Sequence, residues 1–404
     1  EKMLSISQLE STKYARQIYK NVGDQIPELK FEKSLPENSS TLVVLVHNSH
    51  LENHPELLKH HFSNEHIRND LKEHKKVTVY ATEHCKHFHR AVVYLCDLDV
   101  KSSREKIANF AVKISDDLVA MKAKTATVYI EPALKEHLTS EAVGILASVV
   151  ILRGHKFERK NPTGDDKIEK PQKAFDSLTF VCEHLNHEDK EFKFHISTYK
   201  YTIFAREFIG TRANVANTTF VAELATWAQE AFPSLEVNII EGEELAKQGM
   251  NLLYNVGRGS EHPARLITMK YHGNKSTEEF HGLVGKGIVF DSGGLNIKTM
   301  MMDLMYGDKG GCVAVFATMI ALADLKLPVN VVAGLGVAEN SADARSYRPS
   351  DIIRSLNGLT VAIGNTDAEG RLVMADTMTH IQRNFKVTHL IDVATLTGAC
   401  MVAL

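Results

Sequence analysis

The chain has 404 residues, of which 44% are hydrophobic and 24% charged, and its 47 basic and 50 acidic side chains leave a formal net charge of -3. So balanced a charge gives no general electrostatic attraction to nucleic acid or to an anionic membrane, and neither partner is predicted. A chain of this length is expected to form two domains, because one hydrophobic core seldom grows so large.

The cysteines and the apolar segments indicate where the protein works. The chain has 5 cysteines, and no two of them form a CxxC pair. Scattered cysteines argue against a disulfide framework or a zinc finger and are typical of a reducing compartment. No apolar run approaches the roughly 18 residues of a membrane helix, and the charged first residues lack a signal-peptide core. We therefore predict a cytoplasmic protein without a membrane segment.

The first half of the chain alternates short runs rich in valine and isoleucine with amphipathic helical stretches. The predicted strands are 41–47, 76–81, 91–98, 125–133, 177–185 and 193–197. The predicted helices are 102–121 and 140–152. The segment 153–172 is charged and lacks a hydrophobic period, which predicts a surface loop. We interpret residues 1–195 as the smaller, N-terminal α/β domain.

The second half repeats this alternation with more apolar strands. The predicted strands are 264–271, 282–290, 328–338, 359–364 and 386–395. Helical patterns begin near residues 199 and 219 and recur at 311–325 and 371–384. This order predicts a second α/β domain, 196–404, with a mostly parallel, doubly wound sheet. In such sheets ligands bind where loops leave the carboxyl ends of the strands.

Polar side chains are concentrated in loops at three of these strand ends. The loops are 285–298, 301–311 and 364–372. Asp367 and Glu369 are two residues apart, so an extended segment points both carboxylates the same way. Such carboxylates repel each other, and a divalent cation such as Mg²⁺, Mn²⁺ or Zn²⁺ removes the repulsion. Spacing does not make the three loops converge, so it leaves a solvated surface turn as the alternative.

Three motifs carry a resemblance to a known family. NTDAEGRL at 365–372 is similar to the signature octapeptide of the cytosolic leucyl aminopeptidase family. VGKGIVFDSGGLNIK and MDLMYGDKGG resemble the metal loops of that family, and DVATLTGA at 392–399 continues the likeness. The motifs follow the family's order, whereas the N-terminal half is only diffusely similar. The resemblance implies that 196–404 is the catalytic domain and that 1–195 is non-catalytic.

The resemblance also implies a dinuclear metal centre. Its ligands would be Lys286, Asp291, Asp308, Asp367 and Glu369. Asp291 and Glu369 would bridge two divalent ions, Zn²⁺ in both sites or Mn²⁺ or Mg²⁺ in one of them. Only a neutral lysine has a lone pair to offer, and two adjacent dications can depress the pKa of Lys286 far enough.

The reaction that the resemblance implies is hydrolysis of the N-terminal residue, leucine or another apolar residue, from peptides with a free N-terminus. A hydroxide activated by both metals would attack the carbonyl. Lys298 would stabilise the oxyanion, and Arg371 would hold a bicarbonate ion that relays the proton. The expected assembly is a hexamer. Matching substrate-cleft positions are Met305, Asn365, Thr395, Leu396 and Gly398.

Departures from the family pattern keep an alternative open, a non-hydrolytic member that acts as a binding or assembly module. The segment TMMM, between Lys298 and Asp303, is one residue shorter than the usual pattern. Lys309 places a cation beside a metal ligand, where it either weakens metal affinity or points outward. The family's catalytic domain also continues beyond Leu404, so we expect the chain to be incomplete at its C-terminus.

Overall fold

The computed structural model describes residues 27–36, 39–47, 65–80, 88–99, 101–155, 175–182 and 188–403. Most of the predicted loop 153–172 lies outside these ranges. The chain divides between Lys200 and Tyr201 into two compact units, here called the N-terminal and C-terminal units. The predicted boundary, between 195 and 196, falls within helix α6 (Lys190–Gly210).

The N-terminal unit contains a six-stranded sheet in the order β1-β6-β5-β2-β4-β3. Its strands are β1 (Glu28–Glu32), β2 (Ser39–His47), β3 (Lys76–Tyr80), β4 (Phe88–Cys96), β5 (Thr125–Ile130) and β6 (Ser177–Val181). Its helices are α3 (Glu65–His74), α4 (Arg104–Ala120), the 3-10 helix η3 (Pro132–Glu136) and α5 (Ser140–Gly154). All strand pairs are parallel except β3 with β4. The predicted α/β class is confirmed.

One predicted strand of this half is wrong, because residues 193–197 belong to α6. The buried residues Phe192, Tyr199 and Ile203 recur at the spacing of a helical face rather than every second residue. The side chain of Asp189 also accepts a hydrogen bond from the backbone N–H of Glu191, in the first turn. Aromatic and β-branched residues favour a strand locally, but burial along one helical face outweighs that preference.

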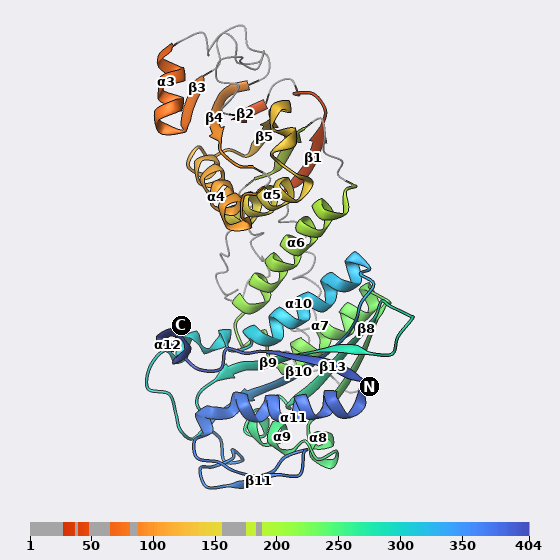
Figure 1. The fold of residues 1–404 in the computed structure, drawn as a ribbon. Coiled ribbons are helices and arrows are strands. Elements are labelled where there is room, and N and C mark those ends of the chain that lie inside the picture. The colour runs from red at the N-terminus through yellow and green to blue at the C-terminus, as the bar shows by residue number, and fades with distance from the viewer. Residues whose placement is uncertain are drawn as a thin grey trace, which may run out of the picture. The chain divides into compact units, whose positions relative to one another are not determined.

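The C-terminal unit is built on a five-stranded sheet in the order β13-β9-β10-β8-β7 (Figure 1). Its strands are β7 (Leu235–Glu241), β8 (Arg265–His272), β9 (Phe280–Asp291), β10 (Asn330–Asn340) and β13 (Val387–Val393). Strands β13, β9 and β10 are mutually parallel. Strand β8 pairs with β10 in antiparallel orientation, and β7 pairs with β8 in the same way. The sheet is therefore parallel on the side where the polar loops emerge.

Helices cover both faces of this sheet, as a doubly wound fold requires. One face is covered by α7 (Thr218–Ala231) and α10 (Gly310–Leu325). The other face is covered by α9 (Asn251–Gly257), which follows the short helix α8 (Glu243–Lys247), and by α11 (Glu369–Asn384). Within the described ranges no helix is long and apolar enough to cross a membrane.

The predicted strand 359–364 does not join the main sheet. Its residues form β12 (Thr360–Ala362), which pairs with β11 (Ile352–Arg354) in a separate two-stranded ribbon. The side chains of Thr360 and Ala362 are exposed, whereas Val361 and Ile363 on the opposite face pack into the core of the C-terminal unit. The ribbon leads instead into the loop that carries Asp367.

The start of α10 packs so closely on the sheet that only glycine fits there. A β-carbon on Gly311 would lie 1.9 Å from the carbonyl oxygen of Val393 and 2.9 Å from the backbone nitrogen of Lys286. A β-carbon on Gly285 would similarly meet the backbone of Cys312 at 2.7 Å. This contact sets the distance between β9 and the helix that follows Asp308.

We expect Gly311→Ala to lower the free energy of unfolding by about 1–3 kcal/mol, the usual cost of overpacking. Without a clash, replacing glycine by alanine inside a helix would stabilise the protein by about 0.5–1 kcal/mol. A lower free energy of unfolding would therefore report the clash. Gly364→Ala is the control, because a β-carbon there has nothing within 4 Å. Urea denaturation of both variants measures the effect, and equal midpoints would show that the helix can shift freely.

Candidate metal centre

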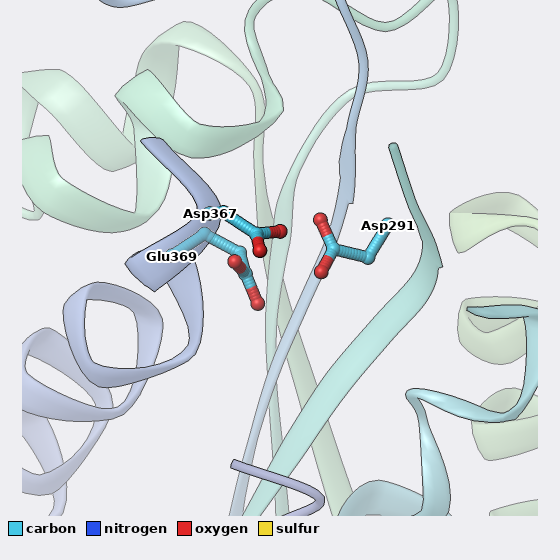
Figure 2. A group of neighbouring side chains, drawn as sticks. All are labelled: Asp291, Asp367 and Glu369. Carbon is cyan, nitrogen blue, oxygen red and sulfur yellow. The ribbon is translucent and has the colours of Figure 1, made fainter. Parts of the chain in front are cut away.

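Three carboxylates from separate parts of the C-terminal unit converge on one point (Figure 2). Asp291 ends β9, Asp367 lies in the 3-10 helix η5 (Thr366–Ala368) and Glu369 begins α11. Each offers a carboxylate oxygen within 4.8 Å of the others. Asp291 and Glu369 are buried, whereas the Asp367 side chain is 32% exposed. Three negative charges this close are unfavourable unless cations lie among them.

Lys286 supplies one such cation on the side of Asp308. Its Nζ lies 2.8 Å from Asp308 Oδ2 and 3.0 Å from Glu369 Oε1, and it donates to the carbonyl of Thr395 at 2.9 Å. Burial by itself lowers the pKa of Lys286, but the charges of Glu369 and Asp308 outweigh it and raise the pKa. A neutral lysine ligand therefore requires the added positive charge of metal ions.

Lys298 supplies the second cation, between Asp291 and Asp367. Its Nζ lies 2.8 Å from Asp291 Oδ2 and 2.6 Å from Asp367 Oδ1. Burial lowers the pKa of Lys298, but the hydrogen bonds and charges of the two aspartates outweigh it, so the pKa is raised. The two aspartates therefore favour the charged form of Lys298.

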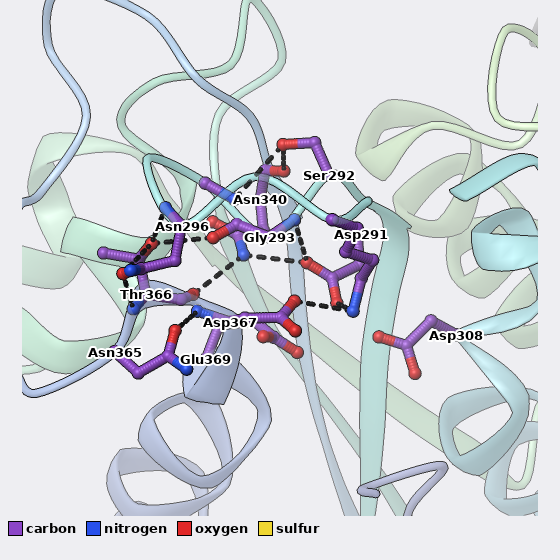
Figure 3. A network of polar contacts seen from close by, with 12 residues as sticks. Asp291, Ser292, Gly293, Asn296, Asp308, Asn340, Asn365, Thr366, Asp367 and Glu369 are labelled. Carbon is purple, nitrogen blue, oxygen red and sulfur yellow. Dashed lines mark hydrogen bonds and ion pairs between the residues drawn. The ribbon is translucent and has the colours of Figure 1, made fainter. Parts of the chain in front are cut away.

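A network of amide hydrogen bonds orients the carboxylates (Figure 3). Asn340 Nδ2 donates to Asp291 Oδ1 at 2.8 Å and to the carbonyl of Thr366 at 3.0 Å. The backbone N–H of Gly293 donates to the same Asp291 oxygen, and Thr366 Oγ1 donates to the carbonyl of Gly293. The loops that carry Asp291 and Asp367 are thus hydrogen-bonded to each other.

The sequence analysis missed Asn340 and Thr366. Asn340 ends β10 and lies in register with Asp291 on the neighbouring parallel strand. A polar residue at a second strand end was therefore a usable signal, because the carboxyl ends of parallel strands meet at one edge. Thr366 is buried between Asn340 and the hydroxyl of Tyr347, which donates to the Thr366 carbonyl at 2.7 Å. Thr366 joins the loops that carry Asp291 and Asp367 through contacts with residues distant in the sequence, which local pattern does not show.

The donor set fits a divalent metal. Within the described part of the chain, Glu369 Oε2 is buried without a hydrogen-bond partner. An unpaired buried carboxylate oxygen is costly, and a bound cation removes that cost. Desolvation raises the pKa of Glu369, although Lys286 opposes this effect. Carboxylates with one amine are suited to Mg²⁺, Mn²⁺ or Zn²⁺ rather than to metals that prefer thiolate ligands.

Arg371 and Asn365 flank the carboxylate pair in the same motif. Arg371 is exposed in the first turn of α11, where the positive end of the helix dipole disfavours a cation and favours a bound anion. Asn365 caps η5, because its Oδ1 accepts a hydrogen bond from the backbone N–H of Asp367 at 2.8 Å. Asn365 thus helps to orient a predicted ligand.

The other predicted cleft residues differ in how they meet the centre. Thr395 Oγ1 donates to Asp308 Oδ1 at 2.7 Å, so this residue is part of the cluster. Leu396 is 40% exposed and packs beside the α-carbon of Gly370. Met305 is half-buried in the 3-10 helix η4 (Met302–Gly307), and Gly398 is exposed.

Lys309 does not point outward, so that part of the prediction is wrong. Its side chain is 0% exposed. Its Nζ donates to the carbonyls of Ile209 and Thr211, at 3.2 and 2.9 Å, and to that of Tyr306. Burial lowers the pKa of Lys309 to about 7. The three carbonyls favour its charged form, since only an ammonium has three N–H groups to donate.

The sequence profile of the cytosol aminopeptidase family, catalytic domain, matches residues 203–404, which hold the whole carboxylate cluster. The chain therefore belongs to the cytosol aminopeptidase family, as its motifs predicted. It is 38% identical over 303 residues to a probable cytosol aminopeptidase of Alkaliphilus oremlandii, covering 74% of this chain and 60% of that protein. A probable cytosol aminopeptidase of Pseudomonas fluorescens is 46% identical over 202 residues, which is 50% of this chain and 40% of the relative.

The fold is similar to that of a solved family member. The apo structure of leucyl aminopeptidase from Trypanosoma cruzi matches with a TM-score of 0.75 and 25% sequence identity, covering 96% of this chain and 78% of that one. Of the two curated relatives described above, the matched part of this chain covers 60% and 40% of their length.

Proposed function

We propose that this protein is a metal-dependent aminopeptidase that removes the N-terminal residue, leucine or another apolar one, from peptides. The observation that carries this proposal is the convergence of Asp291, Asp367 and Glu369 within 4.8 Å, with one Glu369 oxygen buried and unpartnered. Membership of the cytosol aminopeptidase family supports the same reaction. The proposed location is the cytoplasm, which the scattered cysteines and the name of that family support.

Two divalent ions would be held by the five proposed ligands, with Zn²⁺ as the expected metal and Mn²⁺ or Mg²⁺ as an option in one site. The proposed ligands are Lys286, Asp291, Asp308, Asp367 and Glu369. When bound, such ions act as Lewis acids and activate water at neutral pH. Four carboxylates balance the charge of two dications, and Lys286 would join them as a neutral amine, because only that form has a lone pair to offer a metal.

The chain's own residues would perform the remaining tasks. Lys298, whose side chain is 17% exposed, would as an ammonium stabilise negative charge that develops on the scissile carbonyl oxygen. Arg371 would hold bicarbonate at the positive end of α11, where the anion could accept and return a proton. The free α-amine of the substrate would bind at Asp308 and the metal ion that it holds, which restricts cleavage to the first residue. The proposed substrate cleft is lined by Met305, Asn365, Thr395, Leu396 and Gly398.

The test is hydrolysis of an L-leucyl chromogenic amide by protein loaded with Zn²⁺ or Mn²⁺, with metal content measured by elemental analysis. We expect release of the chromophore and two metals per chain. The same amide with an acetylated α-amine should resist cleavage, because an exopeptidase needs the free amine. A chelator should abolish release, and added metal should restore it. No release together with fewer than two bound metals would overturn the proposal.

The alternative, a non-hydrolytic binding or assembly module, rested partly on a cation placed against the metal centre. The Lys309 ammonium instead contacts backbone carbonyls, so this argument for the alternative is weakened. Assembly into a hexamer is proposed from family membership, and light scattering of the purified protein tests it. A monomeric mass would remove this part of the proposal without affecting the aminopeptidase activity.

A further inference from the structure

A buried lysine without a task in the proposed reaction lies directly beside Asp308. The Lys309 ammonium meets three backbone carbonyl oxygens, those of Ile209, Thr211 and Tyr306. An ammonium group has three N–H donors, so these acceptors satisfy it completely. A fully buried lysine without such partners would be strongly destabilising, which implies that the site is built around this side chain.

Two of the three carbonyls lie at the carboxyl end of α6. The last carbonyls of a helix have no partner within the helix, and this end carries a partial negative charge. Helix α6 has no basic residue in its own last turn. Lys309, from a distant part of the chain, therefore supplies an ammonium that caps these carbonyls.

The third carbonyl closes the turn that carries Asp308. Lys309 Nζ binds the carbonyl of Tyr306, and the backbone N–H of Asp308 donates to the carbonyl of Met305 at 3.2 Å. The Arg212 guanidinium lies 3.6 Å from the centre of the Tyr306 ring and holds the same turn from the end of α6. The backbone on both sides of Asp308 is thus tied to the residues around the end of that helix.

We propose that Lys309 is a positioning residue of the metal centre, which caps α6 and thereby fixes the backbone from which Asp308 reaches the metal ions. The inference rests on the proposed function, because it takes Asp308 as a ligand. Lys309 itself contacts neither metal nor substrate. Its loss should disturb Asp308 selectively, since Asp291 is held separately by Asn340 and Gly293.

The test is titration of Mn²⁺ into the metal-free protein and into Lys309→Met, followed by calorimetry. Methionine keeps the length of the side chain and removes the charge and its donors. We expect affinity at one of the two sites to fall about 10- to 100-fold, the usual cost of losing an outer partner of a ligand. Lys247→Met is the matched control, because the Lys247 side chain is 69% exposed and pairs with Glu244 in the same short helix.

A double-mutant cycle with Asp308→Asn separates positioning from a general structural role. If Lys309 acts through Asp308, the double variant should bind Mn²⁺ no more weakly than Asp308→Asn alone. Unchanged Mn²⁺ affinity in Lys309→Met, or additive losses in the cycle, would overturn the inference, even if the unfolding temperature falls. Should Lys309→Met not fold, Lys309→Gln keeps two N–H donors and carries the same test. Failure of the unaltered protein to bind Mn²⁺ would instead overturn the proposed function.

Discussion

Replacing Asp291 with asparagine should abolish both metal binding and peptide hydrolysis. Asp291 is 2% exposed, and its two oxygens accept from Asn340, Gly293 and Lys298. An amide keeps the shape but removes the charge, and its NH₂ group would face one of these donors. We expect kcat/KM to fall by about 10³-fold or more, beyond the roughly 10- to 100-fold cost of losing an outer partner.

Calorimetric Mn²⁺ titration and the leucyl amide assay measure this loss. Asp303→Asn is the matched control, because Asp303 is exposed in the neighbouring 3-10 helix η4. This substitution changes the net charge by the same amount as Asp291→Asn. The control should retain both affinity and rate. Two metals still bound to Asp291→Asn would remove Asp291 from the ligand set.

Replacing Lys298 with methionine should separate catalysis from metal binding. Lys298 touches Asp291 and Asp367 but competes with metal ions for them, so its loss should leave metal affinity unchanged or raise it. Loss of a preorganised charge that stabilises an oxyanion costs about 10²- to 10³-fold in kcat. We therefore expect an inactive protein that still binds two metals.

Steady-state kinetics of metal-saturated Lys298→Met, with elemental analysis of the same sample, provide the measurement. Lys275→Met, which removes an exposed lysine, is the control and should behave like the unaltered protein. A rate that falls only in proportion to lost metal would show that Lys298 supports the centre's structure. An unchanged kcat would exclude the proposed oxyanion role.

Hydrophobic pattern located most elements of the C-terminal unit, because apolar strand runs alternate there with helical stretches. Strand β9 and helix α10 are close to their predicted ranges. The pattern failed where packing opposes local preference. Residues 193–197 have strand-like composition yet lie in α6, since their helical neighbours are buried along one face. The segment 359–364 has strand composition and packs Val361 and Ile363 into the core, yet it pairs with β11 rather than with the main sheet.

The candidate site shows the same division. Asp367 and Glu369 are close in sequence, so a carboxylate pair could be predicted from spacing alone. Motif likeness was needed to add Lys286, Asp291 and Asp308, since spacing cannot show that separate loops converge. Asn340, which carries no charge and belongs to no motif that was noticed, became visible only through its contacts with Asp291 and Thr366.

The amino-acid sequence by itself determined the class of the protein, the order of most of its elements and the residue types of the candidate metal centre, because these depend on local periodicity and on short motifs. Only the tertiary structure decided which charges meet and which helix end receives the ammonium of Lys309. The physical reason is that a side chain's partner is set by long-range backbone packing. A lysine beside a proposed metal ligand in the sequence can therefore turn away from it in space and bind the carbonyls at the end of another helix.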